Sequence, residues 1–214
     1  MTVLERLHEQ YVVGRRARVL ADRLGALIPE GARVLDVGCG DGRLASLIQR
    51  RRVDLRIQGI DCLVRPRTHI AVSQFDGRRI PYEDDSFDVV TLIDVLHHAE
   101  LPEALLGEAA RVARRAVVIK DVAMTGWLAG VTLRFMDRVG NARHGVRAPD
   151  SYWTLEQWRR AFRTVGLEVE VWSDRLGLYP APFAWVFERS FHFLGRLVPR
   201  ADQREVIPPL RDTA

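Results

Sequence analysis

The sequence has few cysteines and no long apolar run. Only two cysteines occur in 214 residues, Cys39 and Cys62, and they do not form a Cys-x-x-Cys pair. This scarcity excludes both a disulfide framework and a cysteine-based zinc site, and we expect no bound metal. No apolar stretch approaches the ~20 residues that a membrane-spanning helix needs. Because residues 1–10 are polar and unlike a signal peptide, we expect a cytoplasmic protein.

Lysine is also nearly absent. Lys120 is the single lysine among 32 basic residues, so the formal net charge of +4 comes almost entirely from arginine. The arginine runs, such as Arg50-Arg51-Arg52, are short and scattered. A phosphate-binding surface would gather such charges on one face. We therefore expect solvated surface charge and no nucleic-acid partner.

Short apolar runs alternate with amphipathic stretches along the chain. Strands are predicted at 33–37, 56–60, 69–75, 87–93, 116–119 and 167–172. Helices are predicted at 3–27, at 44–48 with Asp41 as N-cap, at 102–112, and after the capping box Thr154-Leu155-Glu156-Gln157. This order predicts an α/β fold with a doubly wound, mostly parallel sheet. The link between the second and third strands is too short for a normal crossover helix, so we expect an irregular loop there.

The pattern predicts a single domain over residues 1–198. We expect an N-terminal helical cap at 1–30, an irregular lid over the acceptor at 122–150, and a flexible tail at 199–214. The aromatic-rich segment 183–198 leaves three alternatives: a closing strand and helix, a dimer surface, or peripheral contact with a membrane. Stable membrane insertion is not expected.

A glycine-rich turn follows the first predicted strand. Asp36-Val37-Gly38-Cys39-Gly40-Asp41-Gly42 has the spacing GxGxG, whereas a dinucleotide-binding turn needs GxGxxG and would place its third glycine at Arg43. Glycines there allow a tight turn and the close approach of a ligand. A pyrophosphate would lie poorly beside Asp36 and Asp41. The turn therefore favours a cationic, phosphate-free ligand, and the alternative is a tight turn without a ligand.

Two more carboxylates end neighbouring strands. Asp61 follows the second strand, where an acid can accept both hydroxyl groups of a ribose. Asp76 follows the third strand in Phe75-Asp76-Gly77, where a carboxylate can accept an adenine amino group or form a turn.

These motifs resemble class I S-adenosylmethionine (SAM)-dependent methyltransferases, closest to the small-molecule subgroup of ubiquinone- and menaquinone-type enzymes. The resemblance covers about residues 31–121 and includes Ile80-Pro81-Tyr82-Glu83-Asp84-Asp85-Ser86-Phe87-Asp88 and Asp94-Val95-Leu96-His97-His98. It implies a seven-stranded Rossmann-like sheet, SAM as cofactor and S-adenosylhomocysteine as product. The cofactor-binding residues that it implies are Asp36, Gly38, Cys39, Gly40, Asp61, Cys62, Phe75, Asp76, Gly77 and Asp94.

The methyl transfer itself needs an acceptor held in line with the sulfonium and, for an oxygen or nitrogen acceptor, a base. Candidate catalytic residues are His97, Asp94 and His144, and a purely structural hydrogen bond is the alternative role for His97. Candidate acceptor-binding residues are Tyr11, Arg15, Asn141, Arg143 and Tyr152. Tyr11, Arg15 and Arg16 lie on the first helix, which closes over the cofactor in similar enzymes or simply packs on the domain.

We expect a small, apolar or aromatic acceptor, because the candidate lid is rich in such side chains. Ile93-Asp94-Val95-Leu96 lacks the Asp/Asn-Pro-Pro-aromatic motif of enzymes that methylate nucleic-acid bases. Two other readings remain: a nicotinamide-dependent oxidoreductase on a similar fold, and a binding module that holds SAM without transferring its methyl group.

Overall fold

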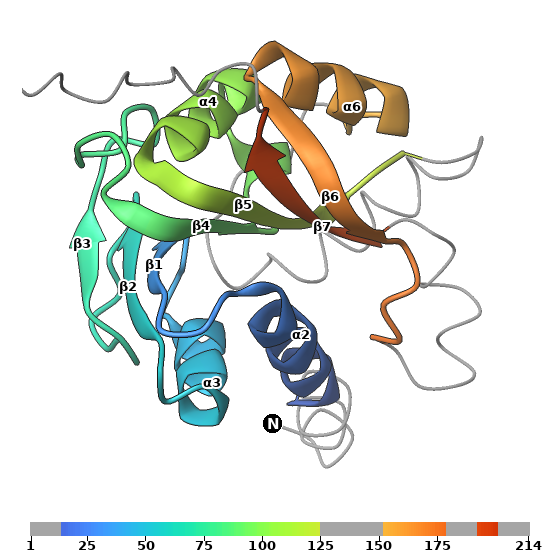
Figure 1. Cartoon of the computed structure of the whole chain (residues 1–214). Helices are drawn as coiled ribbons and strands as arrows, with labels where there is room; N and C mark the ends of the chain where they lie inside the picture. Colours follow the sequence, from blue (N-terminus) through green and yellow to red (C-terminus); the bar gives the residue numbers. More distant parts are fainter. Residues whose placement is uncertain (1–13, 125–151, 179–191, 201–214) are drawn as a thin grey trace, which may run out of the picture.

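The structure is a computed structural model that describes residues 14–124, 152–178 and 192–200 (Figure 1). Seven strands form one sheet in the order β3-β2-β1-β4-β5-β7-β6. The strands are β1 (Arg33–Val37), β2 (Arg56–Asp61), β3 (Val72–Gln74), β4 (Phe87–Ile93), β5 (Ala113–Val122), β6 (Leu167–Ser173) and β7 (His192–Pro199). Strands β1 to β5 pair in parallel, and β7 is antiparallel to both β5 and β6.

Helices cover both faces of this sheet. They are α2 (Gly14–Leu27), α3 (Arg43–Arg51), α4 (Pro102–Val112) and α6 (Leu155–Thr164), with the short 3-10 helix η2 (Leu96–His98) after β4. Figure 1 shows α2 and α3 on one face and α4 and α6 on the other. Alternate strand residues feed two cores: Val34 and Val89 pack on the α2–α3 side, whereas Leu35 and Val90 pack on the α4–α6 side.

The structure confirms the predicted fold class and most of the predicted elements. β1, β4 and α4 have the predicted bounds, and α6 begins at a capping box in which Thr154 Oγ1 accepts from the backbone N–H of Gln157. The N-cap prediction for α3 is wrong, because Gly42 occupies that position in a left-handed conformation. Asp41 instead accepts the backbone N–H of Arg43 through its side chain at 3.0 Å.

The third strand is shorter than predicted. Only Val72–Gln74 pairs with β2. The preceding residues make other contacts, since the backbone N–H of His69 donates to the Asp41 carbonyl at 2.8 Å. Residues 62–71, all of them described, contain no helix, as the short connection predicted.

A strand from the C-terminal part of the chain lies inside the sheet, between two other strands. Residues 192–199 form β7, which lies between β5 and β6 and has its first four residues buried. Of the three alternatives for 183–198, the structure shows the closing strand for residues 192–198. It also extends the ordered fold one residue past the predicted limit at 198. Three further parts of these predictions lie outside the described residues, at 1–13, 183–191 and 201–214. Of the predicted lid at 122–150, only the first three residues are described.

Gly38 is fixed by packing as well as by backbone conformation. Its φ is 69°, and a Cβ built there would lie 2.6 Å from Val95 Cγ2. Gly31 has nearly the same φ, 68°, but no atom of the described residues lies within 4 Å of its Cβ position. Alanine substitutions at the two glycines therefore distinguish the free-energy cost of a left-handed backbone from the cost of a steric clash.

We expect Gly31→Ala to lower the free energy of unfolding by about 1 kcal/mol, because of its left-handed backbone alone. Gly38→Ala should cost about 1–3 kcal/mol more, because the added methyl group overpacks against Val95. Urea denaturation of both variants measures the difference. Partial recovery in the Gly38→Ala, Val95→Ala double variant would support the clash, and equal losses in the two single variants would contradict it.

Candidate functional site

Four aspartates lie where parallel strands end. Asp36 is the fourth residue of β1, Asp61 ends β2, Asp94 follows β4, and Asp121 is near the end of β5. The carboxyl ends of parallel strands share one edge of a sheet, and ligands of doubly wound folds bind there. Each of these carboxylates has a different set of partners.

A cavity of 310 Å³ opens beside the glycine-rich turn. Its lining comes from α2, the β1 turn, the start of α3 and the end of β4, and consists of Arg16, Ala17, Leu20, Asp36, Gly38, Cys39, Leu44, Ile93 and Asp94. Gly40 has a φ of 61°, and no atom of the described residues lies within 4 Å of its Cβ position. Bare backbone at Gly40 thus leaves space in which a ligand can approach the turn closely.

Asp36 is a buried acid at the wall of this cavity. It is 5% exposed, and the Thr91 hydroxyl donates to its Oδ1 at 2.7 Å. Burial raises the pKa of Asp36 to about 7, against the opposing effect of the Thr91 hydrogen bond and with the help of nearby Asp61. A cation bound in the cavity would favour the ionised form of this carboxylate.

Asp61 faces the glycine-rich turn. Its Oδ2 accepts the backbone N–H of Gly40 at 2.8 Å, and its Oδ1 accepts that of Leu63 at 2.9 Å. The next residue, Cys62, is exposed. Burial, together with the neighbouring carboxylates, raises the pKa of the Cys39 thiol, which therefore stays protonated and is a poor nucleophile.

The residues after β3 divide between the core and the surface. Phe75 belongs to the core on the α4–α6 side, together with Ile80. Asp76 is exposed and its Oδ1 accepts the backbone N–H groups of Arg78 and Arg79 at 2.8 and 2.9 Å, which lowers its pKa. Asp76 thus forms a turn here, and its predicted contact with adenine stays a prediction, as does that of Gly77.

Asp94 holds two cations at the inner end of the cavity. Arg16 Nη2 donates to Asp94 Oδ2 at 2.9 Å, and Lys120 Nζ donates to Asp94 Oδ1. Asp94 has a left-handed φ of 56°, which is uncommon for a residue other than glycine. Although burial favours the neutral acid, Lys120 and Arg16 hold the pKa of Asp94 well below its usual value.

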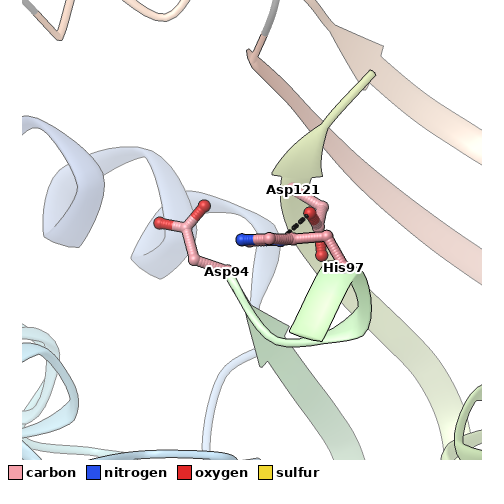
Figure 2. A group of neighbouring side chains, drawn as sticks. All are labelled: Asp94, His97 and Asp121. Atoms are coloured by element: carbon pink, nitrogen blue, oxygen red, sulfur yellow. Dashed lines mark hydrogen bonds and ion pairs between the residues drawn. The ribbon is translucent and has the colours of Figure 1, made fainter. Parts of the chain in front are cut away.

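His97 and Asp121 form a hydrogen-bonded pair at the start of η2. His97 Nδ1 lies 2.5 Å from Asp121 Oδ1, and the Asp121 side chain is fully buried. The backbone N–H groups of Leu96 and Val122 donate to the same carboxylate at 3.1 and 2.7 Å. Figure 2 shows the other ring nitrogen of His97 directed toward Asp94. The imidazole is thus oriented with its second nitrogen toward Asp94, which lines the cavity.

Asp94, His97 and Asp121 could in principle hold a metal ion, since their ligand atoms lie within 4.8 Å of one another. Arg16 and Lys120 already neutralise Asp94, and their positive charges repel a further cation. The arrangement is therefore better suited to proton transfer than to a divalent ion.

The structure brings together only some of the predicted acceptor-binding residues. Tyr152 is buried, with its ring centroid 6.2 Å from that of His97. Arg15 is exposed on α2, whereas its neighbour Arg16 faces the site. Residues Tyr11, Asn141, Arg143 and His144 lie outside the described residues.

Sequence reasoning missed Thr91, Lys120 and Asp121. Thr91 interrupts the apolar run at the end of β4, and Lys120-Asp121 follows the apolar run 116–119 near the end of β5. A charged pair at the carboxyl end of a buried strand is the signal that could have found the last two.

A family model described as "Methyltransferase domain" matches residues 8–171. The chain belongs to this methyltransferase family. It is 29% identical over 172 residues to 27-O-demethylrifamycin SV methyltransferase of Amycolatopsis mediterranei, covering 72% of this chain and 61% of that protein. It is 38% identical over 96 residues to the ubiquinone biosynthesis O-methyltransferase of Hahella chejuensis, covering 39% of this chain and 40% of that protein. The chain thus spans less than two thirds of either relative.

Solved methyltransferases share the fold. A chain from the complex between the Haloferax volcanii Trm112 methyltransferase activator and a methyltransferase superposes with a TM-score of 0.64 at 19% identity, over 88% of this chain and 93% of that one. The family makes SAM the cofactor and removes the oxidoreductase alternative. The carboxylate-lined cavity and the bare Gly40 backbone fit this cationic, phosphate-free nucleoside.

Because Asp36 has a pKa of about 7, SAM binding should depend on pH. Binding of the cation favours ionised Asp36, so below pH 7 the protein must release a proton to bind. We expect the Kd for SAM to rise about tenfold per pH unit as the pH falls below 7, and to level off above it. Calorimetry between pH 5.5 and 8.5 measures this dependence.

The matched control is Asp36→Asn, which keeps the shape of the side chain and removes its titration. This variant should bind SAM more weakly and with a Kd that does not change over the same range. A flat pH dependence in the unmodified protein would rule out a cation contact with Asp36.

Proposed function

We propose that this protein transfers the methyl group of SAM to a hydroxyl oxygen of a small, apolar or aromatic metabolite. The observation that carries the proposal is the His97–Asp121 pair at the carboxyl ends of β4 and β5, beside the cavity. A buried carboxylate on Nδ1 orients the ring and supports Nε2 in the role of a base, which a hydroxyl acceptor needs. Both curated relatives described above carry names of O-methyltransferases.

The proposed cofactor contacts follow from the positions of the carboxylates. Asp61 would exchange the Gly40 N–H for the ribose hydroxyls, and Asp36 would face the positively charged end of the cofactor. Arg16 and Asp94, which pair with each other across 78 residues of sequence, carry the charges that match the carboxylate and ammonium of the methionine part. Cys62, Asp76 and Gly77 would surround the adenine.

When bound, SAM supplies a methyl group already activated by its sulfonium. The protein's own residues then have three tasks: to hold the acceptor in line with that methyl group, to exclude water, and to remove a proton. His97 Nε2 would take the hydroxyl proton as the oxygen–methyl bond forms. Asp121 would fix the ring orientation and stabilise the imidazolium that results.

The acceptor would lie against Tyr152, the described aromatic residue beside His97. We propose that the segment 122–150 covers it as a lid, that His144, Asn141 and Arg143 take part from there, and that Tyr11 and Arg15 contribute from the N-terminal cap. Among the helices that the structure describes, none is long and apolar enough to cross a membrane. We propose a cytoplasmic location and free small molecules as the substrates.

His97→Gln and Asp121→Asn should each lower kcat by about 10²–10³-fold, because both remove the oriented base. Their affinity for S-adenosylhomocysteine should change less than threefold, since neither side chain lines the cavity. The assay uses methyl-labelled SAM with a panel of phenols and fatty acids, which represents the acceptor class.

His98→Gln is the matched control, because His98 lies on the same 3-10 helix with its ring centroid 4.0 Å from that of His97. It should retain activity within a few-fold. Equal losses of kcat in the His97 and His98 variants would contradict the role of His97 as the base.

A further inference from the structure

Lys120 is an unexpected residue at its position. It is the single lysine of the chain and is fully buried within β5, on the face of the strand where Ala116 and Val118 pack in the apolar core. A buried ammonium is costly unless it is paired, and an apolar side chain of similar volume usually gives equal or better stability. Packing alone therefore does not account for a charge here.

Both partners of Lys120 belong to the sheet edge. Lys120 Nζ pairs with Asp94 and lies 3.3 Å from His192 Nδ1. Burial and the adjacent Lys120 lower the pKa of His192 well below its usual value, so this imidazole is neutral and its Nδ1 accepts from the ammonium. Lys120, which lies on β5, thus places a positive charge beside Asp94, the carboxylate that His97 faces.

His97 lies between two carboxylates. Asp121 binds its Nδ1, and Asp94 stands in the direction of its Nε2 (Figure 2). Two negative neighbours favour the protonated imidazolium, and a protonated His97 could not accept a proton. Within the described residues, the charged and titratable groups near it include Asp94, Asp121, Lys120, Arg16, His98, His192 and Tyr152.

Two of these groups are cations that offset the carboxylates. Arg16 pairs with Asp94 from α2, but a third of its side chain is exposed, so solvent screens its charge. Lys120 is fully buried; burial lowers its pKa, the Asp94 carboxylate opposes that shift, and charges interact more strongly there. Lys120 therefore offsets the negative charge of Asp94 more strongly than Arg16 does.

We propose that Lys120 is a positioning residue that acts through Asp94 to keep His97 unprotonated in the pH range in which it must act as a base. By pairing with the Asp94 carboxylate, Lys120 offsets the negative charge that faces Nε2. This inference rests on the proposed function, in which His97 removes the acceptor's proton. It adds a residue that is not among those lining the cavity.

The test replaces Lys120 with methionine, which keeps a similar length and removes the charge. The ring-nitrogen signals of His97, in protein labelled with ¹⁵N-histidine and assigned with His97→Gln, report its protonation directly. We expect the midpoint of the His97 titration to move upward by about one pH unit in Lys120→Met. The acidic limb of the kcat–pH profile should move by the same amount.

Two further variants separate local charge from general effects. Arg114→Met also removes a positive charge from β5, at the far end of the strand where Arg114 pairs with Asp88, and should leave the titration unchanged. The Asp94→Asn, Lys120→Met double variant removes both members of the pair and should bring the midpoint back toward that of the unmodified protein. An unshifted midpoint in Lys120→Met, or the same shift in Arg114→Met, would overturn the proposal.

The unmodified protein provides a test that does not require the variant to fold. Because Lys120 is the single lysine, a ¹⁵N-lysine sample gives one Nζ signal from the chain. That signal should stay in the ammonium form throughout the titration of His97. If Lys120 loses its proton at a lower pH than that at which His97 loses its own, the proposal is overturned. Because no acceptor is involved, this result does not depend on whether methyl transfer is found.

Discussion

Four carboxylates share the carboxyl edge of the parallel strands, and each needs partners that stabilise it there. Each is stabilised in its own way. Asp36 retains a proton near neutral pH, Asp61 accepts backbone N–H groups, Asp94 holds two cations, and Asp121 pairs with His97. Under the proposed function, one part of the edge, at Asp36 and Asp61, binds the cofactor, and another part, at His97 and Asp121, accepts a proton.

The alternation of side chains along β5 produces this division. Lys120 and Asp121 are adjacent, so they point to opposite faces of the sheet. Lys120 reaches Asp94 beside the cofactor cavity on the α2–α3 side, whereas Asp121 reaches His97 at the start of η2. A single dipeptide thus contacts both Asp94, which lines the cavity, and His97.

Much of the fold could be predicted from the sequence, because it depends on local patterns. The β-branched run 33–37 and the apolar run 87–93 gave strands with the predicted bounds, and the glycine-rich turn with Asp61 pointed to the family. The bond from Asp61 to Gly40 and the pairing of Arg16 with Asp94 could not be predicted, since they join residues 21 and 78 positions apart. Helical spacing placed Arg15 and Arg16 on one helix but did not show which of them faces the site. The short β3 depends on His69 bonding to Asp41 instead of to β2.

A crystal structure with S-adenosylhomocysteine tests the central claim most directly. We predict that the ribose hydroxyls bind Asp61, that the amino-acid end lies in the cavity between Gly38, Gly40 and Arg16, and that the sulfur faces the space beside His97 Nε2. A ligand bound elsewhere, or one that leaves Asp61 on the Gly40 N–H and the sulfur directed away from His97, would contradict this account.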